Sequence, residues 1–216
     1  EQVAEHAFAM ASSFTRLLWT YRDQQRTHDW EKHRLAMTDL AGDACCVLGL
    51  GGIGEAVAER AGAFGMSVRG VKRAVEGYDG VADELYRPDD LADALSGARL
   101  LVIAVPLTGE TRGMVGRDEL DALADDAIVV NVARGPVLVT DALRSALDDG
   151  ALYAACLDVT DPEPLPPDDP LWDRDDVLVT PHCAGASEKY PERFLDLFFE
   201  QYDRWCAGEP LRHRVG

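Results

Sequence analysis

A glycine-rich turn at residues 49–54 constrains the fold of this chain more than any other feature. The sequence CCVLGLGGIGEAVA, residues 45–58, reads as a short apolar run, a turn and an amphipathic segment. Apolar residues after the turn recur at the spacing of one buried helix face, at Ile53, Val57, Ala61 and Phe64. Gly49, Gly51 and Gly54 fit the pattern G-x-G-x-x-G. In that pattern the first glycine permits a tight turn, the second lets the backbone approach a pyrophosphate, and the third lets helix and strand pack closely. The stretch therefore predicts a strand and a helix whose first amides face the phosphates of a dinucleotide.

The rest of the chain alternates apolar runs with amphipathic segments, as a parallel sheet covered by helices requires. We expect strands over 45–48, 67–71, 83–86, 100–105, 128–132, 153–159 and 177–180. We expect helices over 53–64, 88–95, 117–124, 140–149 and 187–205, with one or two more between residues 1 and 34. Thr140 is expected to cap its helix, and the proline-rich segment 161–170 is expected to form neither element. The predicted fold is an α/β, doubly wound parallel sheet of the Rossmann type with flanking crossover helices.

The composition excludes several classes of function. The formal net charge is −18, which argues against a nucleic-acid partner, since such binding needs clustered positive charge. So acidic a surface is typical of proteins from high-salt cytoplasms, where ions screen self-repulsion, although a GC-rich genome also favours Arg over Lys. No apolar run approaches the roughly 18 residues that span a bilayer. The five cysteines form no C-x-x-C pair, which indicates a reduced, cytoplasmic protein without a metal site.

Three loops at predicted strand ends carry candidate catalytic residues. Arg134 follows the strand at 128–132 and is suited to binding a carboxylate through its two-pronged guanidinium group. Glu163 stands between two prolines, and His182 follows the strand at 177–180. Taken singly, each also has a plainer interpretation: a surface arginine, an ordinary turn acid and a structural histidine. In an open α/β sheet the ligand lies beyond the carboxyl ends of the strands, where all three are expected.

Six motifs in order make the chain resemble the D-isomer-specific 2-hydroxyacid dehydrogenases. They are GLGGIG, VPLTGETRGMVG, NVARGPV, LDVTDPEPLP, DPLWDRDDVLVTPHCAG and the closing GEPL. The resemblance implies hydride transfer between a nicotinamide cofactor and a small D-2-hydroxy acid or 2-oxo acid. It implies that Arg134 holds the carboxylate and carbonyl of the substrate, that His182 is the acid/base and that Glu163 is its partner. Asp158 would contact the nicotinamide carboxamide. The remaining expected cofactor contacts are Gly49, Gly51, Gly52, Ile53, Gly54, Val105, Pro106, Thr111, Val132, Ala133 and Gly185.

The end of the second predicted strand departs from the common pattern of that family. Many members carry an acidic residue there, which binds both hydroxyls of the adenosine ribose. This chain has Lys72 and Arg73 instead, and Lys72 is one of only three lysines. Two cations would attract a 2′-phosphate, so the sequence favours NADP(H) over NAD(H), with NAD(H) still possible. The alternative is a pair of solvated basic residues on a loop.

The resemblance covers the nucleotide-binding domain, whereas the family's substrate domain is largely absent. We therefore expect residues 1–34 to be a crossover helix and arm from that domain, 35–186 the dinucleotide-binding domain, and 187–216 a return helix and tail. The chain is expected to bind cofactor but to turn over little alone. By resemblance it would pair as a homodimer, with Trp19, Tyr21 and Trp30 as plausible contacts. A nucleotide-sensing module that acts through partner contacts, like the family's corepressors, is the alternative function.

Overall fold

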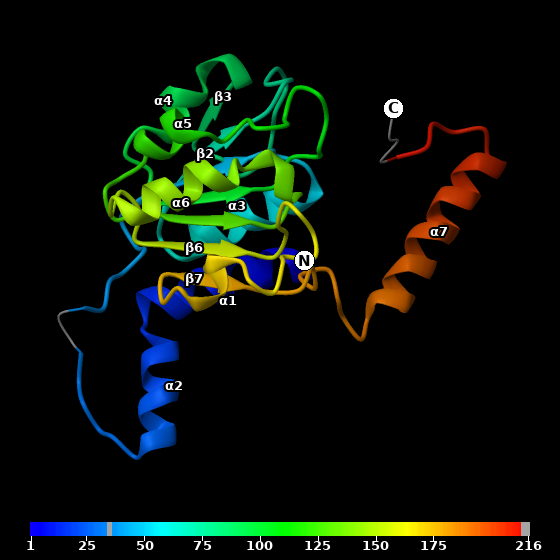
Figure 1. The fold of residues 1–216 in the computed structure, drawn as a ribbon. Helices are drawn as coiled ribbons and strands as arrows, with labels where there is room; N and C mark the ends of the chain where they lie inside the picture. Colours follow the sequence, from blue (N-terminus) through cyan, green and yellow to red (C-terminus); the bar gives the residue numbers. More distant parts are fainter. Residues whose placement is uncertain (34–35, 213–216) are drawn as a thin grey trace. The chain divides into compact units, whose positions relative to one another are not determined.

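A computed structural model describes residues 1–33 and 36–212 of the chain (Figure 1). Seven strands form one all-parallel sheet in the order β3-β2-β1-β4-β5-β6-β7. The strands are β1 (Ala44–Leu48), β2 (Ser67–Val71), β3 (Glu84–Tyr86), β4 (Leu100–Ile103), β5 (Ile128–Asn131), β6 (Ala154–Leu157) and β7 (Val177–Val179). The predicted doubly wound α/β fold is confirmed. Five of the predicted strands (83–86, 100–105, 128–132, 153–159 and 177–180) extend past the observed ones. In three of them the reason is an apolar residue that packs against a core without joining the sheet, namely Val105, Val132 and Val159.

Helices connect these strands and cover the sheet. They are α1 (Gln2–Thr15), α2 (Leu18–Thr27), α3 (Gly52–Ala63), α4 (Leu91–Leu95), α5 (Arg117–Asp121), α6 (Thr140–Asp148) and α7 (Tyr190–Cys206). Short 3-10 helices span Pro88–Asp90, Gly135–Val137 and Pro170–Asp173. The expected cap at Thr140 is wrong: Val139 is the residue before the helix, and the Thr140 hydroxyl donates instead to the Asp161 carbonyl at 3.3 Å. The last helix begins at Tyr190 rather than at residue 187.

Two hydrophobic cores lie on opposite faces of the sheet. Helices α4, α5 and α6 cover one face, and α1 and α3 cover the other (Figure 1). Alternate residues of β1 show the division, because Cys46 and Leu48 belong to the first core whereas Cys45 and Val47 belong to the second. Strands buried on both faces must be apolar throughout, which is why the sequence of each central strand is a continuous hydrophobic run.

The chain divides into two compact units. The first contains Glu1 and Val3–Ala184, so α1 belongs to the same unit as the sheet; the second contains Gln2 and Gly185–Gly216. Within the second unit, no residue of α7 is buried, and large hydrophobic side chains are exposed along it at Tyr190, Phe194, Leu195, Leu197, Phe198, Phe199, Tyr202 and Trp205. In the described ranges, no helix is both long enough and apolar enough to cross a membrane.

Candidate active site

The carboxyl ends of all seven strands lie at one edge of the sheet, because every pairing is parallel. The direction of winding changes between β1 and β4, which are neighbours in space although two strands separate them in sequence. Ligands of such sheets bind in the crevice beyond this point. The loops after Leu48, Ile103, Asn131, Leu157 and Val179 therefore form the edge where chemistry is expected.

In the glycine turn between β1 and α3, neighbouring atoms leave no room for a Cβ at Gly49 and Gly54, whereas a Cβ would fit at Gly51. Gly49 has a φ of +100°, and a Cβ there would lie 2.7 Å from Val105 Cγ1. A Cβ on Gly54 would lie 1.9 Å from the Gly49 carbonyl oxygen. By contrast, a Cβ on Gly51 would meet no atom of the described chain within 4 Å. Gly51 therefore borders open space, as a backbone that approaches a pyrophosphate should.

The start of α3 faces that same open space. Its first helical bond runs from the Glu55 amide to the Gly51 carbonyl at 2.9 Å. The amides of Gly52, Ile53 and Gly54 precede this bond and have no helical acceptor, which makes the helix start a favourable place for phosphate oxygens. A dinucleotide thus fits the residues present, and Gly51 and Gly52 would hold its phosphates.

Lys72 and Arg73 lie at the carboxyl end of β2, as predicted, among partners that the sequence did not indicate. Lys72 Nζ lies 4.6 Å from the centroid of the Tyr78 ring. The Tyr78 hydroxyl donates to Glu55 Oε2 at 3.0 Å, and burial together with the Glu55 carboxylate raises the pKa of Tyr78. The Arg73 side chain is 83% exposed and reaches Glu110 at 3.9 Å. Both cations can therefore reach a ligand, and Tyr78 contacts both the Lys72 ammonium group and the Glu55 carboxylate.

The loop after β5 is pressed against the loop after β6. A Cβ on Gly135 would lie 1.9 Å from the Thr160 carbonyl oxygen, so only glycine permits this approach. The buried Asn131 shapes the preceding turn: its Nδ2 donates to the Arg134 carbonyl at 3.2 Å, and its Oδ1 accepts from the Ala133 amide at 3.1 Å. Arg134 itself is exposed. Its Nη1 donates to the Ala133 carbonyl, and no described contact joins Arg134 to His182 or Glu163.

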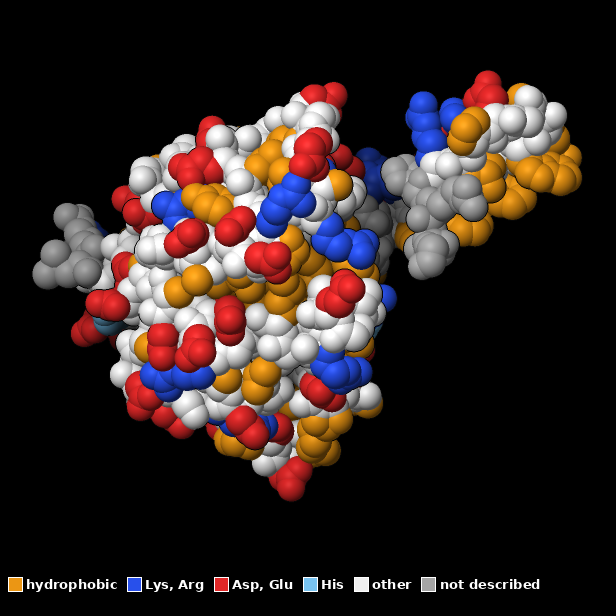
Figure 2. Space-filling model, turned by 90° about the horizontal axis from the view of Figure 1, so that it is seen from above, with side chains coloured by type: hydrophobic (Ala, Val, Ile, Leu, Met, Phe, Trp, Pro, Cys, Tyr) orange, Lys and Arg blue, Asp and Glu red, His pale blue; other side chains and the backbone are white. Residues whose placement is uncertain are grey.

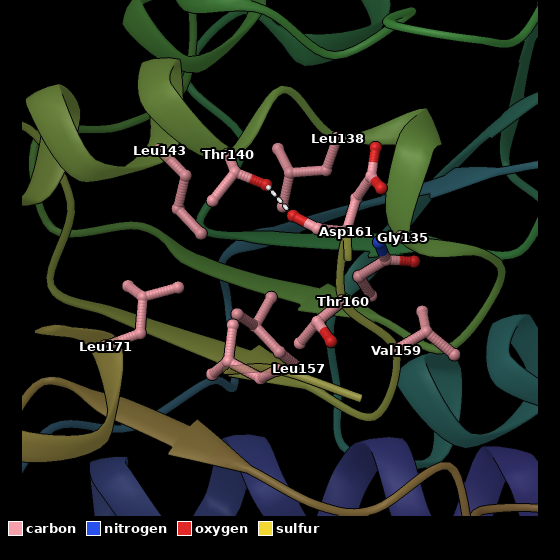
Figure 3. A pocket seen from close by; sticks show the side chains of 11 residues that line it. Gly135, Leu138, Thr140, Leu143, Leu157, Val159, Thr160, Asp161 and Leu171 are labelled. Atoms are coloured by element: carbon pink, nitrogen blue, oxygen red, sulfur yellow. Dashed lines mark hydrogen bonds between the residues drawn. The ribbon is translucent and has the colours of Figure 1, made fainter. Parts of the chain in front are cut away.

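A small cavity of about 10 Å³ lies beneath these two loops (Figure 3). Leucine side chains from α6, β6 and the neighbouring loops line it, and the hydrogen bond from Thr140 to Asp161 closes one side. The cavity has at most the room of a single water molecule. The cavity is therefore too small to hold a substrate.

His182 and Glu163 are brought together. His182 Nδ1 lies 2.5 Å from Glu163 Oε1, and the two side chains are 44% and 39% exposed. His182 has a φ of +51°, which is uncommon for a residue other than glycine. Because Nδ1 is engaged by the carboxylate, Nε2 is the ring nitrogen left for a ligand. The predicted pairing of an acid with this histidine agrees with the geometry.

Asp158 is buried and organises the loop that carries His182. Its Oδ1 accepts from the Thr180 hydroxyl at 2.6 Å and from the Cys183 amide at 2.9 Å, and its Oδ2 accepts from the Ala184 amide at 3.0 Å. Its backbone carbonyl accepts from the His182 amide at 2.9 Å. A carboxylate offers about four acceptor positions, and these three side-chain hydrogen bonds fill most of them.

His6 of α1 joins this group from the far end of the sequence. Its Nε2 lies 3.0 Å from Thr180 Oγ1 and 3.6 Å from Asp158 Oδ1. Ligand atoms of His6, Asp158 and Cys183 all lie within 4.8 Å of one another, a combination that zinc accepts. Since Asp158 Oδ1 already accepts from Thr180 and from Cys183, a cation would have to displace a donor.

Further predicted cofactor residues of the first compact unit lie along the same edge. In the loop after β4, the Thr111 hydroxyl donates to the Pro106 carbonyl at 2.6 Å and fixes the turn that follows Val105. Val132 and Ala133 are buried at the end of β5. Gly185, also among the predicted cofactor contacts, is the first residue after Ala184 and belongs to the second compact unit. Tyr78, Asn131, Thr180 and His6 were not predicted as site residues. Of these, His6 had a visible signal, as a lone histidine among the apolar residues of α1.

Comparison with known proteins places this geometry in a family. A family profile described as "D-isomer specific 2-hydroxyacid dehydrogenase, NAD binding domain" matches residues 8–184. The D-3-phosphoglycerate dehydrogenase of Methanocaldococcus jannaschii is 36% identical over 183 residues, which are 84% of this chain and 34% of that protein. The glyoxylate reductase of Korarchaeum cryptofilum is 34% identical over 219 residues, covering 97% of this chain and 64% of that protein.

A solved structure supports the same assignment. The D-isomer specific 2-hydroxyacid dehydrogenase from Xanthobacter autotrophicus Py2, in complex with NADPH and MES, is 35% identical with a TM-score of 0.85. The match covers 100% of this chain and 87% of that one. The chain spans only a third to two thirds of the two curated relatives described above.

Proposed function

This chain belongs to the D-isomer-specific 2-hydroxyacid dehydrogenases and corresponds to their NAD-binding domain, and we propose that it serves hydride transfer between NADP(H) and a small D-2-hydroxy acid or its 2-oxo acid. The observation that carries this proposal is the 2.5 Å contact between His182 and Glu163, on the same sheet edge as the glycine turn. An imidazole held at one nitrogen by a carboxylate can give or take a proton at the other. Because the chain spans only part of its relatives, the activity is proposed for a protein that also carries a substrate domain.

Reduction of a 2-oxo acid adds one hydride and one proton to its carbonyl group. When bound, the nicotinamide supplies the hydride, or accepts it in the oxidation direction. His182 gives the proton to the carbonyl oxygen through Nε2, while Glu163 fixes the ring through Nδ1. Arg134 binds the carboxylate of the substrate, for which a guanidinium group is the best-suited side chain. The exposed position of Arg134 leaves it accessible for this role.

We assign NADP(H) as the preferred cofactor because of the two cations at the end of β2. Lys72 and Arg73 occupy the place where an acid would bind the ribose hydroxyls, and a 2′-phosphate would pair with them. The relative from Xanthobacter autotrophicus was solved with NADPH. Glu55 opposes this preference, but its carboxylate accepts a hydrogen bond from Tyr78. Affinity of the chain for NADPH and for NADH tests the assignment, and equal affinities would refute it.

We propose three further properties: the oligomeric state, the cellular setting and the turnover of the chain alone. A homodimer is favoured by the exposed aromatic side chains of the arm, where Trp19 is 50% and Trp30 is 88% exposed; a monomeric mass by light scattering in high salt would refute it. A cytoplasmic, high-salt setting is favoured by the acidic side chains spread over the surface (Figure 2) and by five unpaired cysteines. Little turnover is expected from these 216 residues alone, because a substrate domain is needed to exclude water.

The experiment that tests the proposed function compares His182→Asn with His28→Asn in a protein that includes the substrate domain. The two histidines are matched, since both are exposed and both have left-handed backbones, with φ of +51° and +56°. We expect His182→Asn to lose reduction of 2-oxo acids and His28→Asn to retain it. Equal activity of the two variants would remove His182 from the chemistry.

A further inference from the structure

Two consecutive hydrogen bonds link helix α1 to the loop that carries His182, and no role has been assigned to the first two residues that form them. The first joins His6 to Thr180 over 3.0 Å, and the second joins Thr180 to Asp158 over 2.6 Å. His6 and Thr180 are 174 positions apart in sequence. His6 lies on α1 near the buried Ala4, Ala7 and Met10. Its polar ring is therefore held at the edge of an apolar core, where an unused nitrogen would be costly.

The direction of each hydrogen bond follows from the chemistry of the three groups. The Asp158 carboxylate, when ionised, can only accept, so the single hydroxyl proton of Thr180 is donated to it. Thr180 Oγ1 can then only accept from His6. His6 Nε2 therefore carries a proton and donates it to Thr180. Both hydrogen bonds are therefore donated in the same direction, from α1 towards the buried carboxylate.

Asp158, the last residue of this series, is the group that fixes the catalytic loop. The Asp158 carboxylate accepts the amides of Cys183 and Ala184, and the Asp158 carbonyl accepts the amide of His182. The left-handed backbone of His182 is strained and needs such support from its surroundings. Without the Thr180 hydroxyl, Oδ1 would keep only its bond to the Cys183 amide and could rotate away.

We propose that His6 and Thr180 are positioning residues, which orient the Asp158 carboxylate so that it receives the nicotinamide carboxamide while it holds the Cys183 and Ala184 amides directly after His182. This inference rests on the proposed function, because it takes Asp158 as a contact of the nicotinamide. Neither His6 nor Thr180 touches the reacting atoms. They act through Asp158, on the nicotinamide half of the cofactor and not on its adenosine half.

The test uses the 216-residue chain and two ligands that differ only in the nicotinamide-bearing part. NADPH and 2′-phospho-ADP-ribose share the adenosine, the 2′-phosphate and the pyrophosphate. Thr180→Val removes the hydroxyl at nearly constant shape, and Thr180→Ser keeps it. His6→Leu removes the donor, and His6→Gln keeps an N–H donor at a similar reach. Affinities are measured by titration, with nicotinamide fluorescence as the reporter for NADPH.

We expect Thr180→Val to weaken NADPH binding by about tenfold, the loss expected when a hydrogen bond to a charged group is removed. His6→Leu removes a hydrogen bond to a neutral hydroxyl and should weaken NADPH binding by about fivefold. Affinity for 2′-phospho-ADP-ribose should stay within about twofold, since measured effects of distant sites are close to independent. Thr180→Ser and His6→Gln should restore NADPH binding. A general defect of folding would instead weaken both ligands together and would not be rescued.

Equal loss of both ligands, or unchanged NADPH affinity in both variants, would overturn the positioning role while leaving the proposed function intact. Failure of the unsubstituted chain to bind either ligand would overturn the proposed function itself, and this inference with it. The two failures are therefore distinguishable in one set of titrations.

Discussion

Replacing glycines of the turn and of α3 one at a time should separate ligand binding from folding. Gly51→Ala places a methyl group where the described chain has no atom within 4 Å, and its backbone (φ −106°, ψ −164°) is open to alanine. Losing a glycine at the helix start costs about 0.5–1 kcal/mol, and the stiffer unfolded chain returns about 0.4–1 kcal/mol. The free energy of unfolding should therefore hardly change. A methyl group forced against a bound phosphate costs about 1–3 kcal/mol, which is an affinity loss of about 5- to 150-fold.

Gly54→Ala should do the opposite. Its Cβ would lie 1.9 Å from the Gly49 carbonyl oxygen and 2.9 Å from the Gly49 carbonyl carbon. Because both atoms are backbone, relief requires moving α3 away from β1, at about 2 kcal/mol or more. For a chain of this length, that lowers the melting temperature by roughly 5 °C or more.

Gly62→Ala is the matched control within the same helix. A Cβ there meets nothing within 4 Å, and the site lies near the far end of α3. Alanine in a helix is favoured over glycine by about 0.5–1 kcal/mol, so the melting temperature should rise with cofactor affinity unchanged. Thermal unfolding followed by circular dichroism and NADPH titration measure the two quantities. Unchanged NADPH affinity in Gly51→Ala would refute the phosphate assignment, and an unchanged melting temperature in Gly54→Ala would refute the packing argument.

Three further predictions concern the cofactor preference, the cysteines and the surface charge. Replacing Lys72 and Arg73 together by alanine should lower affinity for NADPH by about tenfold or more with little effect on NADH, since each lost charge-assisted contact costs about 1.5 kcal/mol or more; a parallel loss of both would contradict the assignment. Burial raises the pKa of the Cys46 thiol to about 12 and raises the pKa of Cys45 and Cys156 further. At pH 8 a thiol reagent should therefore label only Cys183 and Cys206 in the folded chain. Fast labelling of a third thiol would show that a core strand opens. With a net charge of −18, the melting temperature should rise with KCl into the molar range, and a salt-independent melting temperature would remove the high-salt interpretation.

The sheet could be predicted because central parallel strands are buried on both faces and so appear as continuous apolar runs. Their ends were harder to place. Val132 and Val159 continue the apolar runs and are buried, yet neither belongs to a strand. Hydrophobicity reports burial and carries no information on which buried residues form the ladder. The predicted helix cap at Thr140 was wrong for a related reason. Its hydroxyl donates to the carbonyl of Asp161, which lies on a loop that only the folded structure brings near.

The candidate site divides in the same way. Gly49, Gly51 and Gly54 carry a local pattern, and their positions could be read from six consecutive residues. The pairing of His182 with Glu163 was available only through the resemblance to a family. The contact between His6 and Thr180 could not be read from the sequence, because the two residues are 174 positions apart and only the folded packing brings them together. Long-range polar contacts of this kind depend on the finished packing.

The central claim is that His182, held by Glu163, is the acid/base of a hydride-transfer site. The most direct measurement follows NADPH oxidation with a panel of 2-oxo acids, in a protein that includes the substrate domain, for the unsubstituted protein and for His182→Asn. Loss of a general acid lowers kcat by about 10²- to 10⁴-fold, whereas the Kd for NADPH should stay within about twofold. Retention of kcat in His182→Asn, or its loss together with NADPH binding, would contradict the account.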